Sequence, residues 1–492
     1  MADSFTLPNA RGADDSSPDA ASVPPPPVKE DHLPPATKVA YAMGGTTDIF
    51  GHWLYNGMVD GVFNIFLGVS PTRVSFVRAA MLAADAFSGL FFGWASDNTR
   101  TRWGRRRPWI LFGSIASGIG LPLLFLARSN WSADQIFWYM MLSAILYSPI
   151  IAAYNTPYQS LGFELTPDVD ERTAVMAYRG FTQKAAGAAL SAGMWFATQP
   201  MWTDPATGKP DIAQGAMWFA AIAGLFMIVS GLANFVFVRE RYYDKVQNQG
   251  RASLIAMFGD AAKNKPFLVL LATRLVYAIP TGLMGTIGFY AMTYHVYRGD
   301  VAGASPMHFW TNLSYMIAGF AGIFVTRRVA SLIGKKKTLY ATLAMGLFAF
   351  ASTWWCYTPD NPWLSNIAQA LNGFSATGLW VVLPSMEADV VDYDELGSGQ
   401  RRESAYTATA SWVMKVGMMF SMLIGGPLLE ATGFDAKLPV QTPDAIMGIR
   451  TLFVVIPVTA ILLALVLVKL YPLTTERTNA IRAELEARRG TV

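Results

Sequence analysis

Residues 448–471 read GIRTLFVVIPVTAILLALVLVKLY, an almost uninterrupted apolar stretch in which only Arg450 and Lys469 carry charge. About 20 such residues in a helix cross the roughly 30 Å hydrocarbon layer of a bilayer, so this stretch predicts a membrane helix. Eleven more stretches of this kind precede it, which makes twelve expected helices. They cover residues 41–68, 74–96, 108–128, 136–163, 174–198, 214–238, 267–294, 308–332, 338–358, 363–390 and 405–430.

The composition agrees with an all-α integral membrane protein. Of the 492 residues, 52% are apolar and only 15% are charged, whereas soluble proteins have about 25% charged residues. Backbone polar groups in lipid must bond within the segment, which favours helices, and no pattern of alternating barrel strands is visible. The single cysteine, Cys356, excludes a disulfide framework and a cysteine-cluster metal site. With only four histidines besides, we expect no metal and no resident cofactor.

The distribution of basic residues predicts the topology. If both termini are cytoplasmic, 27 of the 38 Lys and Arg residues fall in cytoplasmic loops and tails, as membrane insertion favours. These charges therefore indicate orientation in a lipid bilayer, and we expect no nucleic-acid partner. Four bases lie inside expected helices, namely Arg179, Lys184, Arg274 and Lys415.

The expected organisation has five parts. Residues 1–38 hold eight prolines and no apolar run, which predicts a disordered Pro-rich cytoplasmic tail. Two six-helix bundles at residues 39–238 and 266–472 flank a central cytoplasmic loop at 239–265, and residues 473–492 form a second tail. Matching residues recur in the two bundles at a constant offset in the sequence. Gly104 is followed by three arginines as Gly334 is by three lysines, and Arg172 is matched at the same offset by Arg402. Such duplication is typical of transporters whose substrate binds between two halves.

Ionisable residues inside the membrane point to function, because each costs about 2.5–3.5 kcal/mol at a helix centre. The first expected helix carries Asp48, His52, Asn56 and Asp60 at four-residue spacing, which places them on one helix face. The second carries Asp85, with Arg78 on the same face. An interhelical salt bridge explains any one of them, but together with Arg179, Lys184, Lys415 and the amides of the fourth helix they describe a polar cavity.

Four ordered segments resemble the glycoside–pentoside–hexuronide:cation symporters of the major facilitator superfamily, typified by the melibiose carrier. They are Gly93 to Trp109 with its Asp97 and arginine cluster, Thr156 to Leu161, Asp168 to Arg172 with Arg179 following, and Ala388 to Ser404 ahead of Lys415. The resemblance covers about residues 38 to 472. It implies two pseudo-symmetric bundles, transport by alternating access, a monomer, and a multi-pass protein of a bacterial inner membrane.

The resemblance also implies roles for single residues. Asp48 is similar to the sugar-binding carboxylate, Asp85 to a carboxylate of the cation site, Arg179 to a sugar-contacting arginine, and Lys415 to the lysine that links the halves. With the neighbouring polar groups, the expected sugar-binding set comprises Asp48, His52, Asn56, Asn155, Gln159, Arg179, Trp412 and Lys415. We expect Asp85, or Asp48, to carry the coupled cation.

Two departures bear on that cation. Sodium-coupled relatives have acids where this chain has Gly89 and Asn155. Sodium requires several oxygen ligands with charge compensation, whereas a proton needs one carboxylate. We therefore expect import of a glycoside or small oligosaccharide with a proton, and regard sodium as the weaker alternative.

Other interpretations stay open at this stage. The chain could be an uncoupled facilitator or a carrier of another polar solute such as a small organic acid. The four intramembrane bases could also serve an anionic substrate such as a hexuronide. An enzyme is not expected, because no His-Glu metal motif, Gly-x-Ser-x-Gly turn or phosphate-binding loop lies at membrane depth. We expect Asp97 to pair with Arg102 and Arg106, and Asp389 with Arg402, in cytoplasmic ion pairs that close a gate. The alternative is that these charges only fix topology.

Overall fold

The computed structural model describes residues 32–166, 169–205, 208, 210–240, 264–399, 402–438 and 440–489. Most of the expected tail at 1–38, most of the expected loop at 239–265, and Asp168 lie outside these residues. The predicted end of the tail at residue 38 is too late in the sequence, because the first helix already begins at Pro35.

Helices occupy most of every expected span, and several spans extend a few residues beyond the helix ends. The first half contains α1 (Pro35–Val59), the π-helix η1 (Asp60–Phe66), α2 (Pro71–Asn98), α3 (Arg107–Leu123), α4 (Ala133–Glu164), α5 (Val169–Ser191), α6 (Gly193–Ala197), the short 3-10 helix η2 (Pro200–Trp202) and α7 (Ile212–Phe237). The second half contains α10 (Lys265–Tyr290), the π-helix η3 (Ala291–Val296), α11 (Val301–Ile333), α12 (Lys335–Cys356), α13 (Leu364–Ser398), α14 (Glu403–Ala431), α15 (Pro443–Lys469) and α16 (Thr475–Arg489).

Several helix starts follow from local sequence. At α4, the Ser132 side chain accepts from the Gln135 backbone N–H while the Gln135 side chain accepts from the Ser132 N–H, a reciprocal capping box. At α10, the Asn264 side chain accepts from the backbone N–H of Phe267. These caps satisfy donors that have no partner within the helix and so set where each helix begins.

Eight helices among the described residues are long and apolar enough to cross a membrane by length and composition. They are α2, α4, α7, α10, α11, α12, α14 and α15, with α10 continued by η3. The other long helices, α1, α3, α5 and α13, coincide with expected spans but do not meet the same criterion. In α1, α5 and α13 the reason is the polar groups they carry, and α3 has only 17 residues. The chain is therefore a multi-pass membrane protein, and twelve crossings remain a prediction.

The halves repeat each other in backbone detail. Helix α1 continues into the π-helix η1, and α10 continues into the π-helix η3. The two π-helices end at Phe66 and Val296, which are separated by the same offset as Gly104 and Gly334. Gly104 and Gly334 both have positive φ, of 105° and 84°. Residues that carry a side chain rarely adopt a positive φ, which explains glycine at both positions. The expected duplication is thus visible in the structure.

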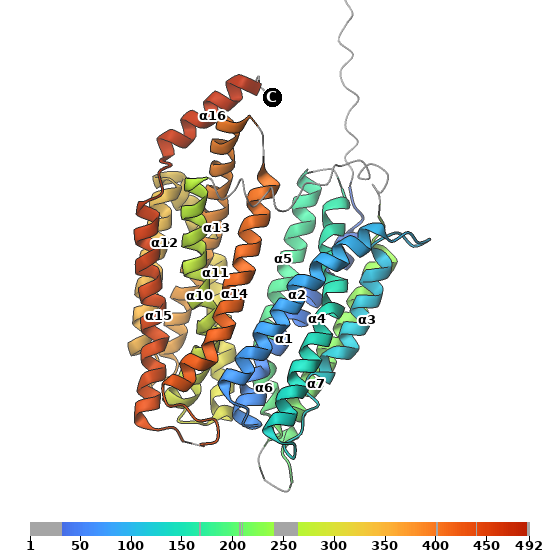
Figure 1. Cartoon of the computed structure of the whole chain (residues 1–492), viewed down its shortest axis with the longest axis vertical. Coiled ribbons are helices and arrows are strands. Elements are labelled where there is room, and N and C mark those ends of the chain that lie inside the picture. Colours follow the sequence, from blue (N-terminus) through green and yellow to red (C-terminus); the bar gives the residue numbers. More distant parts are fainter. Residues whose placement is uncertain are drawn as a thin grey trace, which may run out of the picture.

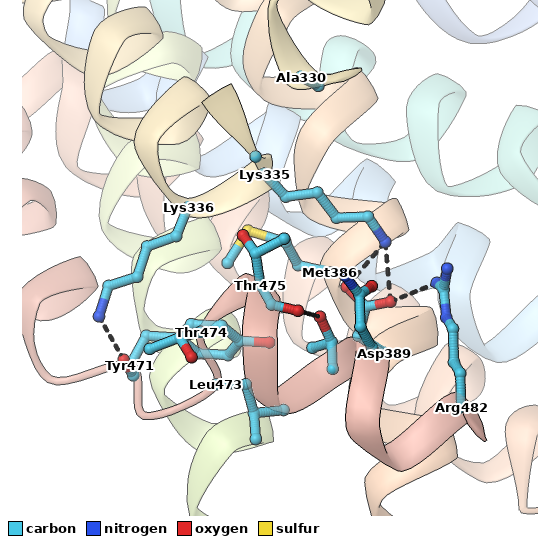
Figure 2. Close-up of a pocket in the computed structure, with 13 residues that line it drawn as sticks. Ala330, Lys335, Lys336, Met386, Asp389, Tyr471, Leu473, Thr474, Thr475 and Arg482 are labelled. Carbon is cyan, nitrogen blue, oxygen red and sulfur yellow. Dashed lines mark hydrogen bonds and ion pairs between the residues drawn. The ribbon is translucent and has the colours of Figure 1, made fainter. Parts of the chain in front are cut away.

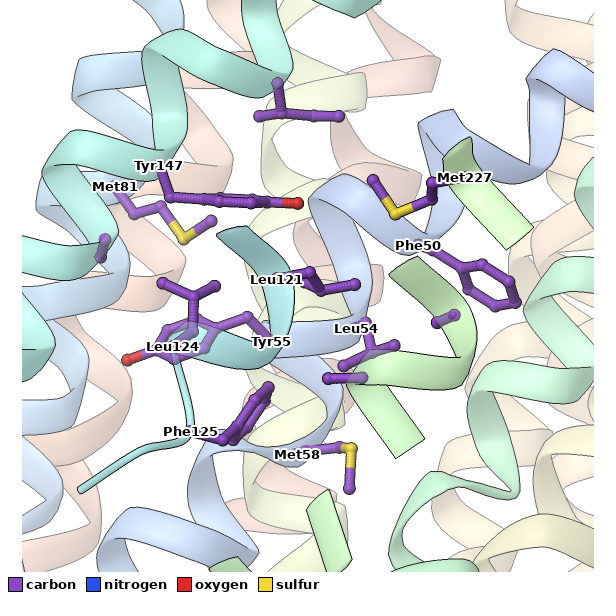
Figure 3. Close-up of a cluster of buried hydrophobic side chains, with 14 of the residues drawn as sticks. Phe50, Leu54, Tyr55, Met58, Met81, Leu121, Leu124, Phe125, Tyr147 and Met227 are labelled. Carbon is purple, nitrogen blue, oxygen red and sulfur yellow. The ribbon is translucent and has the colours of Figure 1, made fainter. Parts of the chain in front are cut away.

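Each half is held together by its own buried cluster. In the first half, Tyr55, Phe63 and Phe125 pack ring against ring with centroids 5.7 to 6.1 Å apart. Figure 3 shows Tyr55 and Phe125 among Leu54, Met58 and Leu121 of the same cluster. The second half has separate clusters around Phe267 and Tyr290. Among the described residues, one buried cluster thus lies mainly in the first half and two lie mainly in the second.

The two halves meet at one end of the helices and diverge toward the other (Figure 1). At the first end, called here the closed end, the backbone N–H of Gly426 donates to Ser75 Oγ at 2.7 Å and that of Thr72 donates to Glu430 Oε1 at 3.1 Å. A Cβ on Gly426 would overlap the Pro71 carbonyl oxygen, so glycine permits this approach. Helix α16 lies at the other end, called the open end.

Candidate functional site

A polar stripe runs along α1 into the start of η1 and consists of Asp48, His52, Asn56 and Asp60. Its first residue faces neighbouring helices of the first half. Asp48 Oδ2 accepts from Gln183 Nε2 at 2.9 Å and lies 3.4 Å from Arg179 Nη2, both on α5. The Arg179 guanidinium also lies over the Tyr158 ring, 5.2 Å from its centroid. The structure therefore brings together Asp48 and Arg179, two residues of the expected sugar-binding set. Gln183 was missed, although it lies four residues after Arg179 on the same helix face.

His52 stands between two carboxylates. Its Nδ1 lies 3.4 Å from Asp48 Oδ1, and its Nε2 lies 3.3 Å from Asp85 Oδ1 on α2. The other oxygen of Asp85, Oδ2, lies 3.7 Å from Lys415 Nζ on α14. Acidic and basic groups thus alternate from Arg179 through Asp48, His52 and Asp85 to Lys415, and the series crosses from the first half to the second. We call these five residues the charge series.

A second buried ion pair lies nearer the closed end. Arg78 Nη2 donates to Asp60 Oδ2 at 2.8 Å and to the Asn56 carbonyl oxygen at 2.7 Å. Arg78 Nη1 donates to Thr286 Oγ1 at 2.9 Å on α10, which links the halves. Sequence reasoning placed Arg78 on the face of Asp85 and did not find Asp60 as its partner. The signal was present, because Asp60 ends the polar stripe of α1.

A cavity of about 410 Å³ lies between the halves beside this pair. Both halves line it with polar and aromatic side chains. Its walls include Trp53, Asn56, Asp60 and Arg78 from the first half and Thr286, Phe289, His308 and Asn312 from the second. Of these, only Asn56 belongs to the expected sugar-binding set, because His308 and Asn312 lie on an expected helix to which no function was given.

The remaining residues of the expected sugar-binding set lie on α4 and α14. Gln159 Nε2 donates to Asn155 Oδ1 at 2.9 Å, so the two amides of α4 bind each other. Trp412 on α14 is half exposed. A Cβ on Gly89 would have only Thr156 Oγ1 within 4 Å, at 3.7 Å, so this position on α2 faces α4. The roles of Asn155, Gln159 and Trp412 stay predictions.

The second half holds its own ion pair. Arg274 Nη1 donates to Glu387 Oε1 at 2.7 Å, and the guanidinium lies over Trp380. Glu387 was not among the expected site residues, although Arg274 was recognised as an intramembrane base. Within the described part of the chain, no group of three or more His, Cys, Asp or Glu residues could hold a metal ion.

The expected gate pair of the first half is present in part. Arg106 Nη2 donates to Asp97 Oδ1 at 3.1 Å, and Arg105 and Arg106 both bind Glu164, at 2.5 and 2.8 Å. Arg102 instead lies over the ring of Trp103, 4.9 Å from its centroid. The pairing expected between Arg102 and Asp97 is therefore wrong for this conformation. Arg102 precedes Gly104, whose positive φ turns the chain between the two arginine positions.

The gate pair expected in the second half is also different. Lys335 Nζ donates to both oxygens of Asp389 at 2.8 and 2.7 Å, and Arg482 of α16 donates to Asp389 Oδ1 at 2.6 Å, as Figure 2 shows. Arg402 instead donates to both oxygens of Asp394, at 2.9 and 2.8 Å. Pairing of Asp389 with Arg402 was thus wrong, because Asp394 lies one turn closer to Arg402 along the chain. Among the described residues, each of these ion pairs at the open end joins two residues of the same half.

The fold and the interhalf site define a membrane transport protein built from two related bundles. Residues 40–475 match the family described as MFS/sugar transport protein. The chain belongs to this family and, within the major facilitator superfamily, to the glycoside–pentoside–hexuronide:cation symporters. Its relatives and its fold are those of transporters, and sugar transport by symport is the activity of the family.

Relatives and solved structures agree with this assignment. The chain is 24% identical to a glucuronide carrier protein homolog of Escherichia coli (strain K12), over 92% of this chain and 96% of the relative. It is 25% identical to a putative glycoside/cation symporter of the same organism, over 91% and 94%. A crystal structure of a mutant of the nucleoside transporter NupG superposes with a TM-score of 0.64 at 11% identity, covering 89% of this chain and 99% of the other. The last likeness concerns the fold alone.

Proposed function

We propose that this protein imports a neutral glycoside or small oligosaccharide together with a proton, by alternating access. The observation that carries the proposal is the charge series, in which Asp48 and Asp85 are joined through His52 and linked to the second half by Lys415. Carboxylates and amides are groups that bind sugar hydroxyls, and the relatives include a protein named as a putative glycoside/cation symporter. Twelve crossings with both termini in the cytoplasm complete the proposal, which makes the closed end extracellular.

The groups around Asp85 do not favour a sodium ion. The two groups beside the Asp85 carboxylate are His52 and Lys415, both of which can carry positive charge. A sodium ion needs several oxygen ligands, and the neighbouring positions Gly89 and Asn155 supply no carboxylate. Protonation of Asp85 would instead weaken its ion pair with Lys415, which joins the halves. Proton binding and rearrangement of the halves are coupled in this way.

Sugar binding acts at the other end of the same series. Sugar hydroxyls that bind Asp48 would compete with Arg179 and Gln183 for the carboxylate, and His52 would transmit the change to Asp85. Each ligand can shift the equilibrium only by its differential affinity for the two conformations. The contacts of Asp48 and Asp85 are those that differ when a sugar or a proton arrives.

An anionic sugar is the second candidate, and Lys184 is the observation that favours it. Lys184 is exposed on α5 and lies 5.9 Å from the Phe320 ring centroid on α11, across the boundary between the halves. Among the described residues it has no carboxylate partner, unlike Arg78, Arg179, Arg274 and Lys415. A uronate could supply that partner. Lys184→Gln would then weaken binding of a glucuronide and leave binding of a neutral disaccharide unchanged.

Uptake of labelled sugars into membrane vesicles tests the main proposal. One charge moving through 100 mV provides about 2.3 kcal/mol, which corresponds to roughly fiftyfold accumulation. We expect an uncoupler to abolish that accumulation, and Asp85→Asn to abolish it while sugar exchange continues. Asp134→Asn is the matched control, because Asp134 is exposed at the start of α4 and outside the charge series. Accumulation that survives the uncoupler, or that requires sodium, contradicts proton coupling.

A further inference from the structure

We propose that a second cavity, at the open end of the second half, binds a phosphate group. This cavity lies at the start of α12 and has a volume of about 110 Å³. Its walls also include residues of α11, α13 and α16 and of the segment 471–474 that joins α15 to α16 (Figure 2). None of the residues of the charge series lines it. The site therefore goes beyond the proposed function and does not depend on which solute is transported.

The first half shows which kind of group binds at the equivalent position. There, the Glu240 carboxylate accepts hydrogen bonds from three consecutive backbone N–H groups at the start of α3. The donors are Arg105, Arg106 and Arg107, at 3.1, 2.7 and 3.2 Å. Unpaired N–H groups and the helix dipole make the start of a helix a favourable place for an anion. In the first half the chain itself provides this anion.

The second half has the corresponding donors but lacks the carboxylate. Lys335, Lys336 and Lys337 match the three arginines at the constant offset between the halves, and they begin α12. Within the described part of the chain, none of their backbone N–H groups donates a hydrogen bond to a side chain. The residue that matches Glu240 at the same offset is Leu470, which carries no charge. The first N–H groups of α12 are therefore open to an anion from outside the chain.

A buried hydroxyl of the cavity is a second, independent sign of a ligand. Tyr471 is only 2% exposed and lines the cavity, and its hydroxyl forms no hydrogen bond with any described residue. Figure 2 shows Tyr471 among the other side chains of the cavity wall. Burial raises the pKa of this hydroxyl above its usual value, so it stays protonated and can donate a hydrogen bond. Buried polar groups without partners are rare in proteins, and an anion in the cavity would accept this proton.

The charges around the cavity leave a positive excess. Asp389 is the one acid among the described residues that line it, and Lys335 and Arg482 both bind its carboxylate. Arg482 also lies 3.8 Å from Asp392, so these four charges compensate one another. Lys336 lines the cavity as well, but its Nζ donates only to a backbone carbonyl oxygen and has no carboxylate partner among the described residues. The positive charge of Lys336 is therefore available to an anion.

A phosphate group fits the size and the arrangement of the donors. The volume of about 110 Å³ corresponds to roughly four water molecules at about 30 Å³ each. The N–H groups of α12, the Tyr471 hydroxyl and the Lys336 ammonium group come from separate parts of the wall, and a phosphate group offers three or more acceptor oxygens to them. The start of α16 is seated at the same point, because a Cβ on Gly334 would overlap Thr475 Oγ1. A bound phosphate group would thus link α12 to α16.

Calorimetry on the purified full chain tests the site with two probes, inorganic phosphate and the short-chain lipid dihexanoyl phosphatidic acid. Dihexanoyl glycerol, which lacks the phosphate group, is the control for the lipid. We expect Tyr471→Phe and Lys336→Gln each to weaken binding of the phosphate probes about tenfold, because each removes a hydrogen bond to a charged group. Tyr340→Phe and Lys337→Gln make the same chemical changes on α12 at side chains outside the cavity. At about 0.15 M salt, which screens exposed charges, these two controls should change the affinity less than twofold.

The two probes also identify the source of the phosphate group. Binding of phosphatidic acid at least about tenfold tighter than that of inorganic phosphate assigns a lipid headgroup, and comparable affinities assign a soluble phosphate compound. The proposal is overturned if neither probe binds more tightly than dihexanoyl glycerol, or if Lys337→Gln weakens binding as much as Lys336→Gln does. Tyr471→Phe removes a hydroxyl that has no partner among the described residues, so an unchanged unfolding temperature without phosphate shows that the variant is folded.

Discussion

The ion pair between Arg78 and Asp60 allows a quantitative test of how the closed end is held. Both side chains are almost fully buried, and Arg78 also bonds to the Asn56 carbonyl and to Thr286 of the other half. Arg78→Met leaves the Asp60 carboxylate buried without its charged partner. Breaking a buried ion pair from one side costs about 3–5 kcal/mol, so we expect the free energy of unfolding to fall by that amount.

The neighbouring pair of Arg73 and Asp134 provides the matched control. It also begins on α2, with Nη1 to Oδ1 at 2.6 Å, but its side chains are 40% and 75% exposed. Exposed pairs are worth at most about 1 kcal/mol, so Arg73→Met should cost no more than that despite the shorter distance. The comparison separates burial from geometry as the source of the stabilisation.

The free energy of unfolding of both variants is measured in mixed detergent micelles with increasing dodecyl sulfate. Circular dichroism detects the loss of helix. The double variant Asp60→Asn with Arg78→Gln should cost less than Arg78→Met alone, because it leaves no buried charge. A loss below about 1 kcal/mol for Arg78→Met, or a loss equal to that of Arg73→Met, would refute the reasoning. A double variant less stable than Arg78→Met would refute it as well.

Two further predictions concern packing and the closed end. Tyr290→Phe removes a hydroxyl that donates to Asn64 Oδ1 of the other half at 2.8 Å. The lost bond is worth about 1 kcal/mol, so labelling of a cysteine introduced at the closed end should rise about fivefold, and unchanged labelling would contradict this role. Gly373→Ala would bring a Cβ into overlap with the Tyr315 carbonyl oxygen, whereas Gly285→Ala meets no atom within 4 Å. We expect the first to lower the free energy of unfolding by about 1–3 kcal/mol and the second by far less, and equal losses would contradict the packing argument.

The amino-acid sequence by itself determined the class of protein and much of its layout. Apolar runs of membrane length place the helices, because a chain in lipid must satisfy its backbone within each segment. The constant offset that relates Gly104 to Gly334 returns in the backbone as the matched π-helices η1 and η3. Four-residue spacing also placed Asp48 and His52 on one face of α1, because helix geometry is local.

Only the tertiary structure decided which groups meet. Periodicity gives the face of a helix but not the rotation and tilt that turn this face toward a particular neighbour. In the folded protein Arg78 therefore donates hydrogen bonds to Asp60 and Thr286, and Arg402 donates to Asp394 in place of the expected Asp389. Lys415 meets Asp85 from a helix of the other half, in a distant part of the chain. Such contacts depend on how two separately packed bundles dock, and that docking depends on contacts spread over whole helix faces rather than on any short segment of sequence.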